Sequence, residues 1–341
     1  MYEEAAPPGP LAGVARCVWR SASAGPKRIV PDGCLDLVVG DGGVFIAGPD
    51  TAAWSSVTRP RAELRGVRFT PGRAPAVLGV AADELRDRRV SLGELWGRAG
   101  EELAERLLSG ELTPAQAVAS RLAEAPPPDP AVAALIARLD AGAARVSEAT
   151  AMVMGTAEAA AVLARGGASP AQVAEAAAAL ARGGAGSAPI AAALARQGAD
   201  PTQVAEAAAV LARQGTDPAQ LAALLGQPGT PRAPQSGAPD VAAARLEDPG
   251  PFAVSERRLR RRFVQAVGYG PATYLRVSRF QRAVALAPRV AGLAALAAAA
   301  GYSDQAHLSR DCRALTGLTP RGYFRAPSTV DETGRDRRRS A

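Results

Sequence analysis

The segment between residues 293 and 323 is the part of the chain whose fold the sequence constrains most. An apolar stripe at spacing i, i+3, i+4 predicts a helix that ends at Gly301, where glycine permits a left-handed residue. Ser303 or Asp304 can cap a second helix, which runs to about Leu315 and is closed by a glycine and a proline. A short glycine-containing turn between two helices predicts either a helix-turn-helix or an ordinary αα-hairpin.

Charge is concentrated in the same region. Residues 255–325 hold thirteen Arg against three acidic residues, a net of +10, whereas the chain up to residue 254 sums to −4. GC-rich codon usage explains an abundance of Ala, Arg, Gly and Pro, but it does not explain why Asp and Glu are scarce here. Phosphate binding requires a basic surface, and here the positive charge is confined to the helical hairpins. The charge and the helix-turn-helix pattern together predict DNA binding.

Two stretches of this region carry a family resemblance. VSERRLRRRFVQAVGYGPATYLRVSRFQRAVALA begins at Val254, and GYSDQAHLSRDCRALTGLTPRGY begins at Gly301. Together they resemble the DNA-binding domain of AraC-type bacterial transcription regulators, over roughly eighty residues. The resemblance implies two helix-turn-helix units whose recognition helices, Ser255–Val267 and Ser303–Leu315, enter successive major grooves on one face of the DNA. It also implies a connecting helix from Pro271 to about Leu286.

Helical geometry separates the side chains of the two expected recognition helices. The i, i+4, i+8 repeat of Leu259, Phe263 and Val267 turns one face of the first helix inward. Leu308, Cys312 and Leu315 form the inward face of the second. On the outward faces an arginine can pair with guanine or hold a phosphate, and a glutamine suits adenine. The residues expected to bind DNA are Arg257, Arg260, Arg261, Gln305, Ala306, Ser309, Arg310 and Arg313.

A β-rich region precedes the helices. CLDLVV, GDGG and VFIA, between residues 34 and 47, predict a hairpin with glycines in its turn. Pro31-Asp32-Gly33 predicts an earlier turn, and LRGVRF at 64–69 predicts a further strand. Residues 15 to about 70 are therefore expected to be mostly β.

From about Arg73 the pattern becomes helical. Ser91 can cap a helix that runs through Leu108, and a further helix is expected from Pro114 to Ala123. RIVPDGCLDLVV, AGPDTAAW and GVRFTPGRAPAVLGVAADELRDRRVSLGELWG resemble the small, uncharacterised β-rich domain often found ahead of this type of DNA-binding domain. The resemblance implies that residues 1–125 sense an effector or mediate self-association.

Three acidic residues of the β-rich region could form a carboxylate site. Asp32, Asp36 and Asp50 are the candidates, but two of them lie beside glycine or proline. Aspartate beside those residues is most often a turn residue, because its side chain bonds the backbone two residues on. We therefore expect turn positions here rather than an enzymatic site.

The composition argues against a metal, a cofactor or catalysis. Cys17, Cys34 and Cys312 are isolated, so the sequence offers neither a disulfide framework nor a CxxC zinc site. His307 is the single histidine, and no nucleophile and base occur together. No apolar run approaches eighteen residues and the N-terminus lacks a signal pattern, so we expect a cytoplasmic protein without a membrane segment.

An internal repeat separates the two parts of the expected DNA-binding domain. Residues 157–187 align with 188–218 at a period of 31, with about twenty identities. Proline after Ser or Asp, and glycine after each helix, divide every unit into a two-helix hairpin. The repeat is either a neutral low-complexity expansion or a small α-solenoid for self-association or a protein partner. Its apolar stripe is mostly Ala, which buries little area, so these hairpins are expected to be marginal alone.

The position of the repeat bears on the first helix-turn-helix. The helix ARVSEATAMVMG at 144–155 has the pattern of its first half, but the expected continuation appears only at Val254. The insert thus interrupts the unit at its turn. Alternatively, DVAAARLED at 240–248 replaces the lost helix, and DPGPF forms an enlarged turn.

The sequence therefore predicts an α+β protein in which a small β-rich N-terminal domain precedes an all-α tandem helix-turn-helix domain, interrupted by a helical hairpin repeat. The expected function is sequence-specific transcription regulation on double-stranded DNA, with a small-molecule effector and a homodimer as further partners to test. The rival is an interaction scaffold that has lost or weakened DNA binding. The expected domains are 1–125 (sensor), 130–154 (first helices of the DNA-binding domain), 155–239 (repeat and return), 240–325 (tandem helix-turn-helix) and 326–341 (basic tail).

Overall fold

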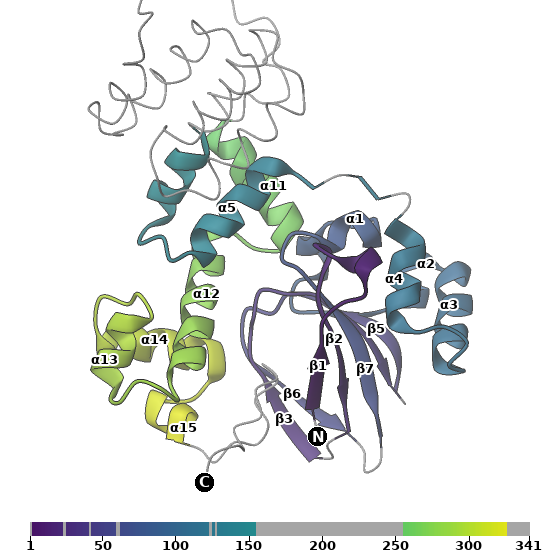
Figure 1. Ribbon diagram of the computed structural model, residues 1–341, viewed down its shortest axis with the longest axis horizontal. Coiled ribbons are helices and arrows are strands. Elements are labelled where there is room, and N and C mark those ends of the chain that lie inside the picture. Colours follow the sequence, from purple (N-terminus) through teal and green to yellow (C-terminus); the bar gives the residue numbers. More distant parts are fainter. Residues whose placement is uncertain are drawn as a thin grey trace, which may run out of the picture. The chain divides into compact units, whose positions relative to one another are not determined.

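The computed structural model of the chain is shown in Figure 1. The predicted repeat, the 240–248 helix and the basic tail lie outside the residues that it describes. The described residues are 2–22, 25–40, 42–58, 62–122, 125–126, 128–154 and 255–325.

The N-terminal region is built on an antiparallel sheet of six strands in the order β1-β2-β7-β4-β5-β8, beside a two-stranded ribbon of β3 and β6. The hairpin between β4 and β5 is confirmed, since Val39 pairs with Val44 and Gly40 with Gly43. Gly43 has a φ of 115°, which explains the glycine at this turn. The strands are β1 Tyr2–Ala5, β2 Ala15–Ser21, β3 Gly25–Ile29, β4 Asp36–Gly40, β5 Gly43–Ala47, β6 Trp54–Thr58, β7 Leu64–Phe69 and β8 Arg89–Ser91.

The β region extends beyond the predicted limits. β7 has the predicted bounds, but β1 begins at Tyr2 and β8 lies after the helical pattern has started. Both are edge strands of the six-stranded sheet. Three or four residues are too few for an alternation of apolar and polar residues to stand out, so these strands could not be identified from periodicity.

The expected helix from Ser91 to Leu108 is two helices. Ser91 caps the first, because its hydroxyl accepts a bond from the Glu94 N–H at 3.0 Å. Gly97, with φ 58° and ψ −139°, then turns the chain in a conformation that side-chain-bearing residues rarely adopt. The helices of this region are α1 Ala74–Leu78, α2 Leu92–Trp96, α3 Arg98–Leu108 and α4 Pro114–Leu122, with short 3-10 turns at Gly9–Leu11 and Ala82–Leu85.

The two faces of the sheet have different roles. Side chains alternate between faces along a strand, so Leu37, Ile46 and Val67 point to one side and their chain neighbours to the other. The first set is buried with residues of α1–α4, such as Leu107, in a single hydrophobic core. Figure 1 shows these helices gathered along the sheet. The opposite face is left for polar and aromatic side chains, which form the pocket described below.

The C-terminal region is helical, and the connecting helix has its predicted bounds. Phe280 in this helix lies 5.3 Å, centroid to centroid, from the ring of Tyr323, while Phe263 meets Tyr274 edge to face at 5.8 Å. A further helix occupies 146–154. Within the described residues, no helix is long and apolar enough to cross a membrane. The labelled helices are α5 Pro130–Asp140, α11 Glu256–Val267, α12 Pro271–Leu286, α13 Leu293–Ala299, α14 Gln305–Thr316 and α15 Pro320–Arg325.

Candidate nucleic-acid interface

The turn between α13 and α14 has the predicted helix-turn-helix geometry. Gly301 has a φ of 86°, the left-handed conformation expected after α13. Asp304, rather than Ser303, is the N-cap of α14, because its carboxylate accepts the His307 N–H at 2.7 Å. The Arg282 guanidinium of α12 donates to the Ala300 carbonyl at 3.2 Å and so ties the turn to the connecting helix.

α14 has one buried face and one exposed face, as the sequence predicts. Leu308, Cys312 and Leu315 are fully buried beneath it. The Ser309 hydroxyl is half-buried and donates to the Gln305 carbonyl at 2.8 Å, so its proton is already used within the helix. The other predicted residues of α14 are exposed: Gln305, Ala306, Arg310 and Arg313.

α11 is divided in the same way. Leu259, Phe263 and Val267 are buried, which confirms the inward face. Arg262, at the edge of that face, forms an ion pair with Asp129, the residue whose carboxylate also accepts N–H bonds at the start of α5. The predicted residues of α11 remain exposed: Arg257, Arg260 and Arg261.

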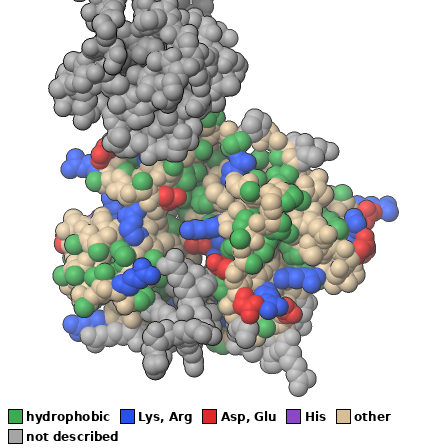
Figure 2. Space-filling model, viewed as in Figure 1, with side chains coloured by type: hydrophobic (Ala, Val, Ile, Leu, Met, Phe, Trp, Pro, Cys, Tyr) green, Lys and Arg blue, Asp and Glu red, His purple; other side chains and the backbone are tan. Residues whose placement is uncertain are grey.

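The exposed arginines are available for an external anion. In the described part of the chain, no ion pair joins any of the five predicted arginines of α11 and α14 to a carboxylate. Figure 2 shows basic side chains at the surface of the helical region. Asp311 of α14 is buried beside His307, and burial raises the pKa of its carboxyl. A surface of exposed arginines that form no ion pairs with carboxylates is suited to a phosphate backbone.

The sequence did not predict a second polar site, on the open face of the N-terminal sheet. A hollow that is open to solvent lies between this face and the β3–β6 ribbon. Asp32, Asp36 and Asp50 all line it, together with Arg68 and Arg89. The expectation that these acids serve as turn residues holds for Asp32, whose carboxylate accepts the Cys34 N–H at 2.9 Å. It is incomplete, because all three carboxylates are also ion-paired.

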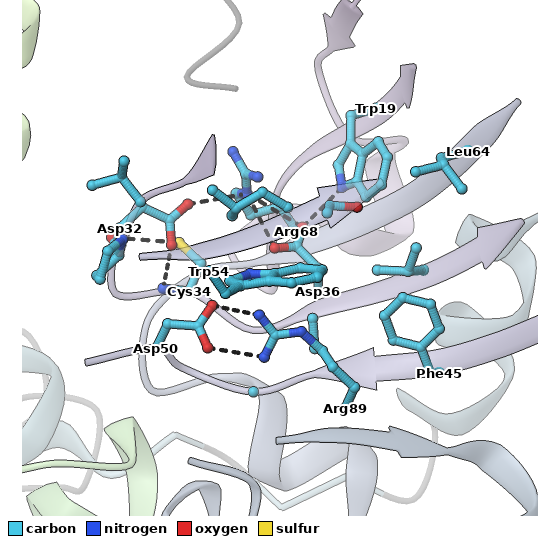
Figure 3. A pocket seen from close by; sticks show the side chains of 17 residues that line it. Trp19, Asp32, Cys34, Asp36, Phe45, Asp50, Trp54, Leu64, Arg68 and Arg89 are labelled. Carbon is cyan, nitrogen blue, oxygen red and sulfur yellow. Dashed lines mark hydrogen bonds and ion pairs between the residues drawn. The ribbon is translucent and has the colours of Figure 1, made fainter. Parts of the chain in front are cut away.

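Two arginines, each paired with carboxylates, organise the pocket (Figure 3). The Arg68 guanidinium lies 3.2 Å from Asp36 and 3.3 Å from Asp32, and Asp36 also accepts the Trp19 indole N–H at 2.8 Å. Burial raises the pKa of the Asp36 carboxyl to about 6, although the adjacent guanidinium acts in the opposite direction. Burial acts to lower the pKa of Arg68, but the neighbouring acids together raise it well above its usual value, so this guanidinium stays charged.

The second pair is bidentate and stacked on a ring. The two terminal nitrogens of Arg89 donate to Asp50 at 2.9 and 2.7 Å. The same guanidinium lies 4.0 Å from the centroid of the Trp54 ring, a cation–π arrangement. Burial raises the pKa of Asp50 against the opposing effect of Arg89. Arg68 lies in the predicted strand at 64–69 and Arg89 in a strand that was not predicted, and strand pairing was needed to bring both to the three acids.

Comparison with known families gives one match in each of the two regions. A family described as a helix-turn-helix domain matches residues 251–326, and a domain of unknown function (DUF6597) matches residues 3–91. No curated protein and no solved structure matches the chain. The C-terminal helices are therefore a DNA-binding domain of the kind found in transcription regulators. The two matches together correspond to an AraC-type regulator with an uncharacterised N-terminal domain, and every residue that lines the pocket lies in that domain.

Proposed function

We propose that the protein is a sequence-specific transcription regulator that contacts two successive major grooves through α14 and α11. The observation that carries the proposal is the outer face of α14. Gln305, Arg310 and Arg313 are exposed over a buried apolar face, on a helix whose N-terminus is capped at a glycine turn. A glutamine and an arginine on such a face can form bidentate bonds to adenine and guanine.

The two helices would contribute differently. α14 follows an uninterrupted turn, so its side chains are positioned for base contacts. α11 presents Arg257, Arg260 and Arg261, its one exposed amide is Gln265 near the end of the helix, and the chain that should form its turn lies in the insert. We therefore propose that α11 contributes mainly phosphate attraction, which adds affinity but little sequence preference.

The N-terminal domain would supply the regulation. We propose residues 1–125 as a sensory domain, and 130–154 with 240–325 as the DNA-binding domain that the 155–239 segment interrupts. An ion-paired, aromatic-lined pocket supports a sensory role, because ligand sites combine apolar walls with a few placed polar groups. No catalytic activity is part of the proposal.

Binding to DNA tests the proposal directly. Full-length protein is used to select bound sequences from a random duplex pool, and the selected site is then compared with a scrambled duplex across a salt series. We expect tighter binding to the selected site, with an affinity that falls steeply as salt rises. Equal affinity for both duplexes at all salt concentrations would favour the rival interaction scaffold.

Footprinting on the selected site tests the division between helices. Base substitutions in the groove contacted by Gln305 and Arg310 should each cost about 1–3 kcal/mol. Substitutions in the neighbouring groove should cost little. Equal costs in both grooves would show that the first unit is intact despite the insert.

A further inference from the structure

The pocket on the N-terminal sheet contains two hydrogen-bond donors without protein partners. Among the described residues, the indole N–H of Trp54 and the Nε–H of Arg89 are buried and make no hydrogen bond. Both side chains line the pocket and are stacked on each other. A buried donor without a partner is costly, and such groups in native proteins usually have an explanation.

The charged groups of the pocket and its other indole are already paired. Arg89 uses its two terminal nitrogens on Asp50, one of them also on the Arg88 carbonyl, and its Nε is the nitrogen that makes no hydrogen bond. Trp19, the other indole of the pocket, donates to Asp36 at 2.8 Å. The contrast between Trp19 and Trp54 is informative, because two indoles in one pocket differ in whether the protein supplies the acceptor. An acceptor for Trp54 and Arg89 would have to come from a ligand or solvent.

The charge of the pocket restricts that acceptor. Three carboxylates face two guanidinium groups, so the lining carries no surplus positive charge to hold an anion. The pKa of the Asp36 carboxyl is raised to about 6, so burial already disfavours its negative form. A further negative charge nearby would be unfavourable. A neutral oxygen or ring nitrogen satisfies the two donors without this repulsion.

The apolar walls restrict the shape of the ligand. Side chains of both sheets line the pocket, including Phe45, Val38, Leu64 and Ile29 beside Trp19. Figure 3 shows Phe45 and Leu64 on one side of the hollow, with the ion pairs and Trp54 on the other. A flat apolar body with one polar end fits this division, because aromatic walls favour stacking or edge contacts.

We propose that this pocket binds a small, uncharged, planar molecule whose carboxamide oxygen or ring nitrogen accepts bonds from Trp54 and Arg89. The inference rests on the proposed sensory role of the domain and names the chemical class of its effector. The aromatic body of the ligand lies against Phe45 and Leu64, and its acceptor lies at the Trp54 edge.

Matched pairs of compounds test the proposal. Full-length protein is titrated with benzamide, nicotinamide and indole-3-acetamide, and with benzoate, nicotinate and indole-3-acetate, using saturation-transfer NMR and calorimetry. We expect at least one amide to bind in the millimolar range or tighter, at least about threefold more tightly than its carboxylate. No amide binding at about 10 mM, or tighter binding by the carboxylates, would overturn the proposal.

Tryptophan variants locate the binding site. Trp54→Phe keeps a ring but removes the donor, and should weaken the bound amide about threefold to tenfold. Trp96→Phe is the control, because Trp96 is also stacked by an arginine but donates to the Leu78 carbonyl outside the pocket. Unchanged binding in Trp54→Phe would refute the assignment. If that variant does not fold, Ser56→Phe, which fills the pocket at the β6 ribbon, should abolish binding.

The same preparation separates this inference from the DNA-binding proposal. The salt-dependent mobility shift on the selected duplex needs no ligand, and the NMR titration needs no DNA. Amide binding without a DNA shift would leave the pocket assignment standing and refute the regulator. A DNA shift without amide binding would do the reverse.

Discussion

Arginine serves two different purposes in the two regions of this molecule. In the N-terminal sheet, Arg68 and Arg89 are enclosed by carboxylates and paired at about hydrogen-bond distance. In the C-terminal helices, Arg261 and Arg310 project from faces where the described chain supplies no carboxylate partner. The residue type is the same, and the surroundings decide its function.

The difference lies in what each guanidinium interacts with. A buried arginine is held by fixed carboxylates and cannot be removed without leaving them uncompensated. An exposed arginine costs little to remove from the fold, because water solvates it, but it remains available to a phosphate or a base. The comparison predicts that substitutions in one region act on folding and substitutions in the other act on binding.

Removing the buried guanidinium should have the largest effect. Arg68→Ala leaves Asp36 and Asp32 without their cation in a buried site, so we expect unfolding to become easier by about 3–5 kcal/mol. Chemical denaturation of the full chain measures this. Arg20→Ala, which removes an exposed ion pair with Glu3, is the control and should cost no more than about 1 kcal/mol. Similar losses in both variants would contradict the contrast.

Arg310→Ala should act on binding and leave the fold unchanged. If Arg310 bonds a guanine, affinity for the selected site should fall by about 1–3 kcal/mol. Stability should stay within about 0.5 kcal/mol of the parent protein, because the side chain is exposed. The control is Arg98→Ala, which removes an equal charge from an exposed position on α3. A loss of stability in Arg310→Ala would show that this arginine resembles those of the sheet.

Arg261→Ala should give a smaller and less selective effect. A phosphate contact contributes to every sequence alike, so affinities for selected and scrambled duplexes should fall together. The slope of log affinity against log salt should decrease in magnitude by about one unit. A loss confined to the selected duplex would instead assign Arg261 to a base and make α11 equivalent to α14.

Two carboxyl groups extend the comparison to pH. Asp36, in the sheet, has a pKa raised to about 6 by burial, whereas the pKa of the Asp304 cap is lowered because its carboxylate accepts the His307 N–H. The contribution of Asp36 to stability is fully present below about pH 4 and is lost as the pH rises through about 6. The contribution of Asp304 to stability is present above the ordinary pKa of an aspartate. It is lost as the pH falls through the lowered pKa of the folded state.

Carboxyl-carbon NMR checks both directions, with Asp36→Asn and Asp304→Asn to assign the signals. Asp36 should titrate near pH 6 and Asp304 below the usual range for aspartate. If the two groups titrated together, the difference in their surroundings would have no electrostatic consequence.

The helical site was predictable because its geometry is local. The 3.6-residue period separates Leu259 and Leu308 from the exposed arginines, and one glycine with one cap fixes the turn before α14. A few tens of residues contain all of this information. Even the choice between Ser303 and Asp304 required only knowing which side chain reaches the His307 N–H.

The pocket could not be predicted because its geometry is non-local. Asp36 and Arg68 lie 32 positions apart and meet because β4 pairs with β7 in one register. Arg89 reaches Asp50 only because β8 pairs with β5 at the edge of the sheet. Strand order and register are set by the whole domain, so aspartates beside glycine or proline could be identified as turn positions but not as pocket residues.

The alternation of side chains along β4, β5 and β7 has a consequence for how the protein can diverge. Every second residue, such as Leu37 and Val67, is committed to the core, while intervening ones such as Val38 and Phe45 line the pocket. Substitutions at Val38 or Phe45 would therefore alter the preference for the proposed ligand without changing the packing of the core on the other face of the sheet. Under the proposed sensory role, selection for a new effector and selection for a stable fold would act on different positions of the same strands, so one scaffold could be adapted to many signals.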